Sequence, residues 1–244
     1  MKKLVMCAAV CLAAVLAVNG MAAYSVSVAS KRMVPIYSVD RQDNCVALSF
    51  DAAWGADKTR KIMDICDDYG VKATFFLVGF WVEKYPELVK EIHLRGFEIG
   101  THSQTHPHMG KLTEEQCADE LQASCKAIFD VTGQMPTLFR PPYGDYGNAL
   151  MRVCGQMGLH VVQWSVDSLD WQGLSAEQIA CRVQKAQSGD IILCHNNSDH
   201  ITEALPLMLE WGKIKGLNFR PVGEVIYTDN YTVDGSGKQT QNKQ

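Results

Sequence analysis

Several side chains that bind metals or transfer protons stand directly after runs of mainly apolar residues. Asp51 follows such a run at 46–50, and His195 follows another at 191–194. Buried strands of α/β proteins have this appearance, and function in these proteins gathers at the carboxyl ends of the strands. The other polar side chains in this position are His102, His106, Arg140, Asp167 and Asp170. We therefore expect all of them to surround one mouth and to form a chemical site.

His102 and His106 are four residues apart. On a helical turn, or on a tight loop that imitates one, this spacing directs both rings at one point. Two neutral imidazoles suit Zn²⁺ and similar metals. The alternative is a pair of loop histidines that only make hydrogen bonds, but the nearby Asp51 favours a metal. His108, two residues further on, is expected to be exposed.

Asp51 is a candidate general base, because a buried or metal-adjacent carboxylate at a strand end can take a proton from water. Its alternative roles are to cap the helix that begins near Asp57 or to pair with Arg140. Arg140 precedes Pro141 and Pro142, which stiffen its loop. The charge of Arg140 would hold Asp51 in place and in its ionised form.

His195 is a candidate general acid if a carboxylate orients its ring, and Asp170 or Asp167 could do so. The alternative for His195 alone is a core histidine whose hydrogen bonds are satisfied. Aromatic side chains on the same mouth suit the apolar face of a ligand, although they could also serve only packing. These substrate-binding candidates are Tyr143, whose backbone N–H could also contact an oxyanion, Trp54 and Trp171.

The elements that must position these residues alternate between strands and helices. Capping boxes mark two helix starts, at Thr113 with Gln116 and at Ser175 with Gln178. Seven strands are expected, at 46–50, 73–78, 97–100, 137–140, 159–166, 191–195 and 218–222. Helices are expected at 57–69, 81–95, 113–132, 148–157, 175–187 and 201–215. This alternation predicts a mainly parallel α/β sheet, either an incomplete (β/α) barrel or an open sheet.

The two ends of the chain differ from this pattern. Residues 1–23 have two lysines followed by an apolar run at 4–18, which is typical of a signal peptide. The apolar run is shorter than a bilayer span of ~20 residues, but residues 4–23 together leave an uncleaved N-terminal membrane anchor open. Residues 24–44 are expected to be a linker or peripheral segment, 45–228 the domain, and 229–244 a polar, disordered tail.

Composition excludes several classes of function. The 244 residues suit one barrel-sized domain plus a leader. With 23 basic against 27 acidic residues and a net charge of −4, nothing indicates nucleic acid as a partner. Nine cysteines would suggest disulfides in an exported protein. The seven beyond the leader lack any short repeated spacing, so we expect mainly reduced, buried thiols.

Over about residues 46–225 the chain resembles the polysaccharide deacetylase family, the NodB-homology domain of carbohydrate esterase family four. Five family motifs occur in order: Ser49 to Asp51, His102 to His106, Arg140 to Tyr143, Asp170 with Trp171, and Leu193 to His195. The resemblance implies a distorted (β/α) barrel with about seven parallel strands. It also implies hydrolysis of N- or O-acetyl groups on peptidoglycan or chitin-like N-acetylglucosamine polymers, assisted by a divalent metal, which we expect to be zinc. With the predicted leader, we expect this reaction outside the cytoplasmic membrane.

The resemblance also implies a role for each motif residue. His102 and His106 would bind the metal, and Asp51 would be the base that activates water. His195 would be the acid, oriented by Asp170, and Arg140 would hold the base. The metal and the backbone of Tyr143 would stabilise the oxyanion that forms when water attacks the acetyl carbonyl.

One position departs from the family pattern. The family usually has a second aspartate after the base, as the third metal ligand, and here this residue is Ala52. Residues 51–55 resemble a sporulation-associated branch in which this position is also non-acidic, which implies a role in spore or cell-wall maturation. Catalytic zinc normally has three protein ligands, so two histidines would hold it weakly. The alternative is a non-catalytic carbohydrate-binding protein on the same barrel; a purely structural envelope protein would leave the motifs unexplained.

Overall fold

A curved parallel sheet carries the candidate site. The structure, a computed structural model, describes residues 32–242, so the predicted leader lies outside the described residues. The strands run in the order β6-β5-β4-β3-β2-β8-β7, and β9 pairs with the first residues of β2. Their bounds are β2 Cys45–Ala52, β3 Thr74–Leu77, β4 Glu98–Thr101, β5 Leu138–Phe139, β6 His160–Val161, β7 Val166–Asp167, β8 Ile191–His195 and β9 Asn218–Arg220. The prediction of a distorted (β/α) barrel with about seven parallel strands is confirmed.

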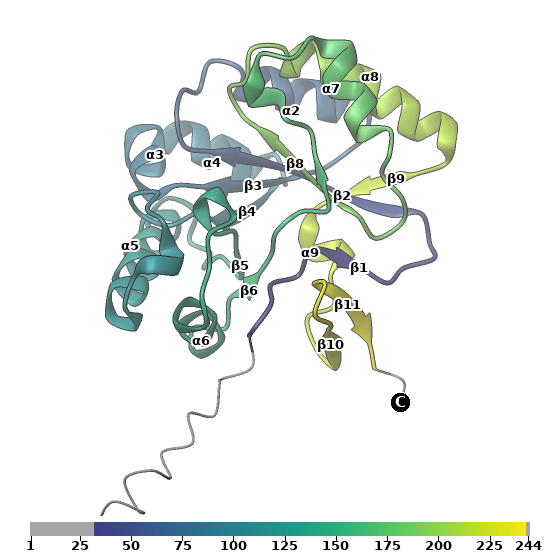
Figure 1. The fold of residues 1–244 in the computed structure, drawn as a ribbon. Helices are drawn as coiled ribbons and strands as arrows, with labels where there is room; N and C mark the ends of the chain where they lie inside the picture. Colours follow the sequence, from purple (N-terminus) through teal and green to yellow (C-terminus); the bar gives the residue numbers. More distant parts are fainter. Residues whose placement is uncertain (1–31, 243–244) are drawn as a thin grey trace, which may run out of the picture. The chain divides into compact units, whose positions relative to one another are not determined.

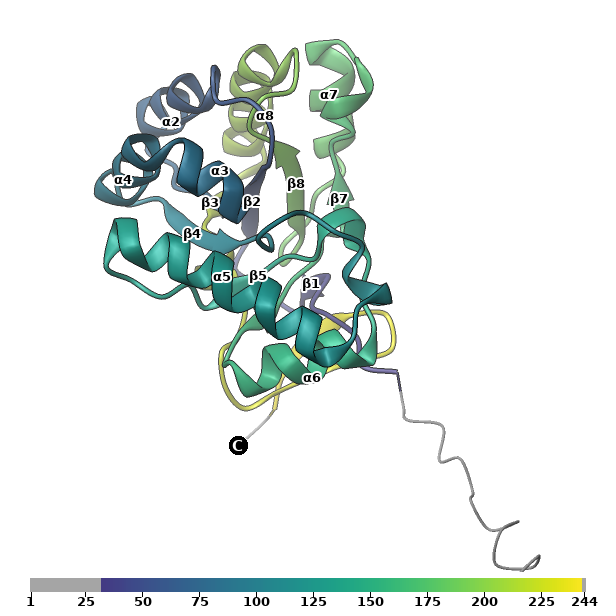
Figure 2. The ribbon, with the colours of Figure 1, turned by 90° about the vertical axis from the view of Figure 1, so that its left-hand side faces the viewer.

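Helices cover the outer face of this sheet (Figures 1 and 2). They are α2 Thr59–Asp68, α3 Gly79–Lys84, α4 Pro86–Leu94, α5 Glu114–Thr132, α6 Asn148–Gln156, α7 Ala176–Val183 and α8 Ile201–Lys215. The short α9 Val222–Val225 packs instead with the residues of the opposite face, which include Ala47 and Phe76. The main core packs the outward residues of β2, β3 and β8 against these helices, and a second cluster lies around Phe76 and Ile191. Both predicted capping boxes are present, at the starts of α5 and α7. No helix in the described part of the chain is long and apolar enough to span a membrane.

Two predicted elements are divided in the structure. The helix expected at 81–95 is replaced by α3 and α4, because Pro86 has no N–H to continue a helix and instead occupies the first turn of α4. The strand expected at 159–166 is replaced by β6 and β7, which do not pair with each other. The sheet therefore stays open between these two strands.

An N-terminal segment runs along the edge of β6. The N–H of Ile36 donates to the carbonyl of Val161 at 2.9 Å, and the carbonyl of Ile36 accepts from the N–H of Gln163 at 2.7 Å. Further along the segment, the N–H of Val39 donates to the carbonyl of Gly189, just before β8, at 2.8 Å. The described part of the expected peripheral segment thus connects the edge at β6 with the turn that precedes β8.

The predicted disordered tail was wrong for the described residues. Residues of the tail form β10 Tyr231–Val233 and β11 Lys238–Gln241, and β11 pairs in parallel with β1, Ser38–Val39. Polar composition misleads here because main-chain pairing and side-chain hydrogen bonds satisfy the polar groups. The Gln239 amide is fully buried and exchanges two hydrogen bonds with the backbone of Tyr227, at 2.8 and 2.6 Å.

Candidate active site

A buried ion pair forms the floor of the site. Asp51 is 6% exposed at the end of β2, and Nη1 of the fully buried Arg140 donates to its Oδ1 at 2.8 Å. The guanidinium carbon also lies 4.2 Å from the ring centroid of Phe76. Burial acts to raise the pKa of Asp51, but the charge of Arg140 and the nearby histidines lower it below its usual value. The carboxylate is therefore ionised at neutral pH, as a base requires.

His102 is fixed in one tautomer by its neighbours. Its Nδ1 lies 2.6 Å from the carbonyl of Arg140, and a carbonyl only accepts, so Nδ1 carries the proton. Its Nε2 lone pair then faces Oδ2 of Asp51 at 3.5 Å. Burial lowers the pKa of His102, against the opposing effect of Asp51, so the ring is neutral at pH 7. A neutral ring with an inward lone pair is ready to accept a proton, a hydrogen bond or a metal.

His106 lies beside His102, with ring centroids 4.9 Å apart. Its Nδ1 is buried and has no hydrogen-bond partner within residues 32–242. Burial and the neighbouring His102 lower the pKa of His106 to about 4, so this ring is neutral as well. The predicted convergence of the two rings is therefore present, although the residues between them form a loop rather than a helical turn.

This loop is held in an unusual backbone conformation. Ser103 and His106 have φ of 68° and 60°, in the left-handed region that non-glycine residues seldom occupy. The N–H of His106 donates to Oγ of Ser103 at 3.0 Å. The carboxylate of Glu120, on α5, accepts from the N–H groups of Gln104 and Thr105 at 2.9 and 2.8 Å. These bonds compensate for the strain and fix where the two histidines point.

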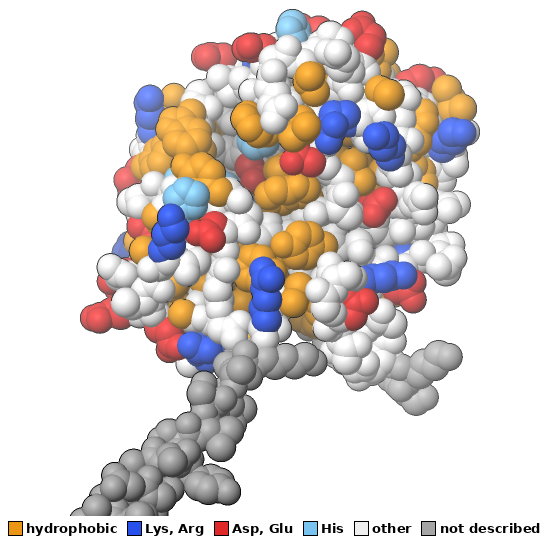
Figure 3. All heavy atoms as spheres, in the orientation of Figure 1, with side chains coloured by type: hydrophobic (Ala, Val, Ile, Leu, Met, Phe, Trp, Pro, Cys, Tyr) orange, Lys and Arg blue, Asp and Glu red, His pale blue; other side chains and the backbone are white. Residues whose placement is uncertain are grey.

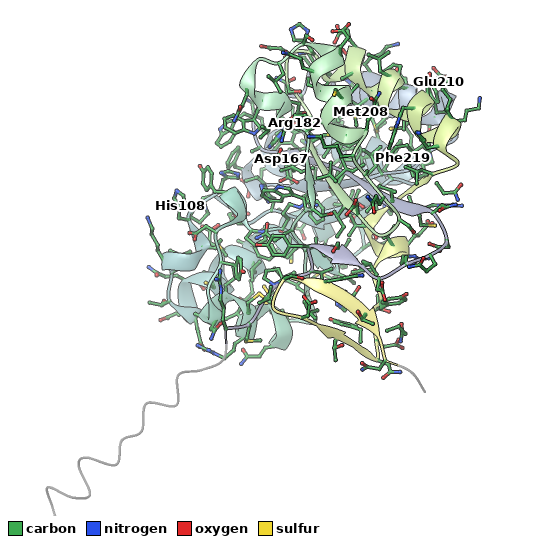
Figure 4. All side chains as sticks on the ribbon, turned by 45° about the vertical axis from the view of Figure 1, so that its right-hand side comes forward. His108, Asp167, Arg182, Met208, Glu210 and Phe219 are labelled. Carbon is green, nitrogen blue, oxygen red and sulfur yellow. The ribbon has the colours of Figure 1, made fainter. Side chains whose placement is uncertain are left out.

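His195 stands across the site from these residues, at the end of β8. Its Nδ1 lies 2.7 Å from Oδ1 of the buried Asp170, whose Oδ2 accepts from the His195 N–H at 2.8 Å. Burial acts to lower the pKa of His195, but the hydrogen bond and charge of Asp170 outweigh burial and raise it above 6.5. Of the two carboxylates expected to orient this ring, the structure places Asp170 there. Asp167 accepts from the N–H of Leu169, and its carbonyl accepts from Arg182 (Figure 4).

Three aromatic side chains stand exposed at the mouth. Trp54, Tyr143 and Trp171 are 63%, 60% and 60% exposed, which is unusual for such large rings. The His106 ring lies 4.8 Å from Trp54 and 4.5 Å from Tyr143, centroid to centroid. Hydrophobic side chains surround a hollow in which histidine and acidic atoms are visible (Figure 3). Exposed rings around a polar hollow suit a ligand with both apolar and polar faces.

His108 is exposed, as predicted, but its side chain contacts two neighbouring residues of the site. Its ring stacks on Tyr143, with centroids 4.4 Å apart, and its Nδ1 lies 3.4 Å from Oδ2 of Asp145. Asp57, near the start of the helix that Asp51 was considered to cap, is exposed. Asp51 pairs with Arg140 instead, which was the second alternative.

Sequence reasoning missed three residues that support the site. Ser198 is 8% exposed, and its Oγ donates to Oδ2 of Asp170 at 2.9 Å. Glu120 holds the histidine loop, and Gln163 contacts Arg140. None of the three residues belongs to a family motif or comes directly after a strand. The one signal in the sequence is that Ser198 lies three residues after His195.

The residues present do not form a three-ligand metal site. Ala52 is fully buried, and its methyl group cannot coordinate. Among residues 32–242, no three His, Cys, Asp or Glu side chains are arranged to hold a metal ion. His102 and His106 are neutral, which suits a metal, but a catalytic zinc normally takes three protein ligands. The donor set is therefore one ligand short.

Comparison with known proteins identifies the family. Residues 38–162 match the family model described as polysaccharide deacetylase. This chain belongs to the polysaccharide deacetylase family. It is 35% identical to a peptidoglycan-N-acetylglucosamine deacetylase of Bacillus cereus, over 75% of this chain and 68% of that protein. It is 34% identical to the uncharacterized protein YlxY of Bacillus subtilis, over 83% of this chain and 63% of that protein. The family's deacetylases are generally metal-dependent.

Solved structures of two kinds resemble this chain. BA3943 of Bacillus anthracis, described as a pseudoenzyme of carbohydrate esterase family 4, has a TM-score of 0.76 and 31% identity, covering 84% of this chain and 69% of that one. A BA3943 mutant is described as having restored enzymatic activity. The Bc1960 peptidoglycan N-acetylglucosamine deacetylase has a TM-score of 0.74 and 33% identity, covering 79% of this chain and 92% of that one. The polysaccharide deacetylase family thus contains both active and inactive relatives of this chain.

Proposed function

We propose that this protein removes N-acetyl groups from N-acetylglucosamine units of peptidoglycan or chitin-like polymers. The observation that carries the proposal is the pairing of an ionised, buried Asp51 with a His195 whose pKa is raised by Asp170. A base and an acid with oppositely shifted pKa values, on one mouth, are the requirement for hydrolysis at neutral pH. The names of the relatives, which include several peptidoglycan deacetylases, supply the substrate class.

Asp51 would take the proton from a water molecule that attacks the acetyl carbonyl carbon. Arg140 keeps this carboxylate ionised and in place, since Asp51 has no freedom to turn away from the guanidinium. As the tetrahedral intermediate breaks down, His195 would give a proton to the nitrogen of the departing amino sugar. The backbone N–H of Tyr143 is our candidate for stabilising the oxyanion. Trp54, Tyr143 and Trp171 would pack on sugar rings around the scissile amide.

In the proposed reaction, any divalent metal ion would be bound weakly by the protein. A divalent ion would supply charge that polarises the carbonyl and the water. His102 and His106 would be its protein ligands, with no third ligand at Ala52. We therefore propose weaker binding than in relatives with three ligands, and Asp51 and His195 carry the proton transfers described above.

A non-catalytic carbohydrate-binding protein is the second candidate. Ala52 favours it, because the change removes a ligand while the aromatic mouth is kept. The resemblance to BA3943, a named pseudoenzyme, favours it too. Against it, the structure keeps the two contacts that proton transfer needs, Arg140 with Asp51 and Asp170 with His195.

We further propose that the protein acts outside the cytoplasmic membrane, on the cell wall or during spore maturation. The relatives named peptidoglycan deacetylases have an extracytoplasmic substrate. Residues 1–23 would direct export, either as a cleaved signal peptide or as an anchor. The cell-wall polysaccharide is the partner, and we expect no nucleic acid.

Acetate release tests the proposal. The protein is incubated with acetylated peptidoglycan and chitooligosaccharides as purified, after chelation, and after restoring Zn²⁺ or Co²⁺. Release that chelator stops and metal restores supports a metal-assisted deacetylase with two protein ligands. Release that ignores the chelator supports hydrolysis by Asp51 and His195 without metal. No release from any substrate, while sugar still binds, contradicts deacetylation and favours the second candidate.

A further inference from the structure

Gln163 connects three parts of the molecule that meet behind the site. It lies two residues after β6 and is 1% exposed, so its polar groups contact mainly the protein itself. Its backbone N–H donates to the carbonyl of Ile36 at 2.7 Å, in the N-terminal segment that runs along the edge of β6. Its backbone carbonyl accepts from Nη2 of Arg140 at 3.1 Å. The residue that receives the N-terminal segment therefore also holds the guanidinium that holds Asp51.

The side chain of Gln163 reaches a second functional segment. Its Nε2 donates to the carbonyl of Gly144 at 3.0 Å. Gly144 ends the short turn Pro142–Gly144, which contains Tyr143 at a φ of 58°. A left-handed conformation at a tyrosine is strained and persists only when its surroundings hold it. The Gln163 amide is one of the groups that hold this turn.

The turn is also packed tightly against the same neighbour. A Cβ added to Gly144 would lie 3.1 Å from the ring of Trp164 and 3.3 Å from Oε1 of Gln163. The ring of Trp164 in turn lies 5.9 Å from the guanidinium carbon of Arg140. The turn, Gln163 and Arg140 thus form one connected group, in which a shift of one member displaces the others.

The amide of Gln163 contributes a directional bond that an apolar side chain cannot replace. An apolar residue of similar length would fill the same space but would lose the bond from Nε2 to the carbonyl of Gly144. It would also leave that carbonyl without this donor.

We propose that Gln163 is a positioning residue, which fixes the Tyr143 turn relative to the Arg140–Asp51 pair. Its backbone sets the distance from the N-terminal segment to Arg140, and its amide sets the distance from Arg140 to Tyr143. The effect on catalysis rests on the proposed deacetylation, because Asp51 and Tyr143 act on the same reacting group there. The effect on the shape of the turn does not depend on that function.

The test compares Gln163→Leu and Gln163→Glu with a matched control, Gln239→Leu. Gln239 is also a fully buried glutamine with a bonded amide, but it belongs to β11 and contacts Tyr227. Gln163→Leu removes the donor to the Gly144 carbonyl and fills the space with an apolar side chain of similar size. Glu keeps the size and places a carboxylate oxygen against the Gly144 carbonyl. Melting temperature, kcat and KM are measured for all, and a crystal structure is determined for Gln163→Leu.

We expect both Gln163 variants to lose about 10-fold to 100-fold in kcat, with a smaller change in KM, because the reacting groups are misplaced rather than the sugar lost. Gln239→Leu should lower the melting temperature and leave kcat and KM unchanged. The crystal structure should show the Tyr143 turn displaced from its left-handed conformation. Wild-type kcat in Gln163→Leu, with a lowered melting temperature like that of the control, would overturn the proposal.

The structural readout separates this proposal from the proposed function. If the wild-type protein releases no acetate, deacetylation fails, and the crystal structure of Gln163→Leu decides the positioning role. A displaced turn then supports it, and a turn unchanged at Tyr143 and Gly144 overturns it.

Discussion

Asp51 and His195 are direct register partners on the neighbouring parallel strands β2 and β8. Main-chain pairing therefore brings the candidate base and the candidate acid to the same level of the sheet, whatever their side chains do. The two residues differ in their environments. Arg140 lowers the pKa of Asp51 against the effect of burial, and Asp170 raises the pKa of His195 against the same effect. Opposed shifts of this kind widen the pH range in which a carboxylate and an imidazolium coexist.

Asp51→Asn should abolish acetate release, because the amide cannot take a proton from water. We expect a loss of at least about 100-fold. The change also leaves the buried Arg140 without its partner, which costs about 3–5 kcal/mol when a buried ion pair is broken. Acetate release, sugar binding and urea unfolding are measured together. Sugar binding that persists without acetate release places the defect in chemistry, whereas activity near the wild-type level removes Asp51 from the role of base.

The pH dependence of kcat/KM should be bell-shaped. Asp51 works as a base only when ionised, and its lowered pKa places the acid limb below its usual 3.8. His195 works as an acid only when protonated, and its raised pKa places the alkaline limb above 6.5. Asp170→Asn removes the group that raises the pKa of His195, so burial then dominates and the alkaline limb should move to lower pH. An alkaline limb that does not move excludes His195 as the acid.

The free energy of unfolding should depend on pH through the pKa shifts of Asp51 and His195. The lowered pKa of Asp51 contributes stability above its unfolded pKa, and this contribution is lost as pH falls through the folded pKa. The raised pKa of His195 contributes stability below about 6.5, which is lost as pH rises through the folded value. Urea unfolding across pH measures both. In Asp170→Asn the alkaline loss should disappear, and its persistence would show that another group causes it.

Ala52→Asp should create affinity for Zn²⁺. The variant adds a carboxylate at the end of β2, directly after Asp51 and opposite Leu77 of β3. Without metal the buried charge should destabilise the protein, and Zn²⁺ should restore the melting temperature, since a ligand that binds only the folded state stabilises it. Calorimetric titration with Zn²⁺ compares this variant with Ala52→Asn, which has the same shape without the charge. Equal affinity in the two variants would contradict a missing third ligand at this position.

Trp54→Ala and Trp171→Ala should weaken sugar binding more than they slow the chemistry. Loss of an aromatic contact costs about 1 kcal/mol, which corresponds to about a five-fold rise in the dissociation constant. Phe129→Ala, on α5, is the control, because Phe129 is 45% exposed and takes no part in the mouth. Titration with chitooligosaccharides measures the affinities. Unchanged binding in both tryptophan variants would mean that these rings serve packing alone.

Much of the site could be predicted because local sequence and strand ends determine it. Apolar runs locate β2 and β8, and the first polar residue after each run is Asp51 or His195. The His102 and His106 rings converge because a short loop between them leaves few arrangements. These inferences need only the neighbours of each residue along the chain.

The parts that could not be predicted depend on contacts between distant residues. Gln163, Ser198 and Glu120 reach the site through bonds that span 16 to 28 positions. The polar tail pairs with β1 nearly two hundred residues earlier, which its composition conceals. Likewise, Ile36 belongs to no hydrophobic period that would mark it as the partner of Val161.

The N-terminal segment along the edge of β6 has a consequence for the order of folding. Ribosomes release the residues around Ile36 early, yet their partners are Val161, Gly189 and Lys238, which emerge much later. Contacts at such long separation close slowly, because the intervening chain loses much entropy on closure. The N-terminal segment can therefore take its full set of partners only after the last residues of the chain have emerged. A nascent chain that stops before β11 would carry every family motif and still lack the strand that pairs with β1.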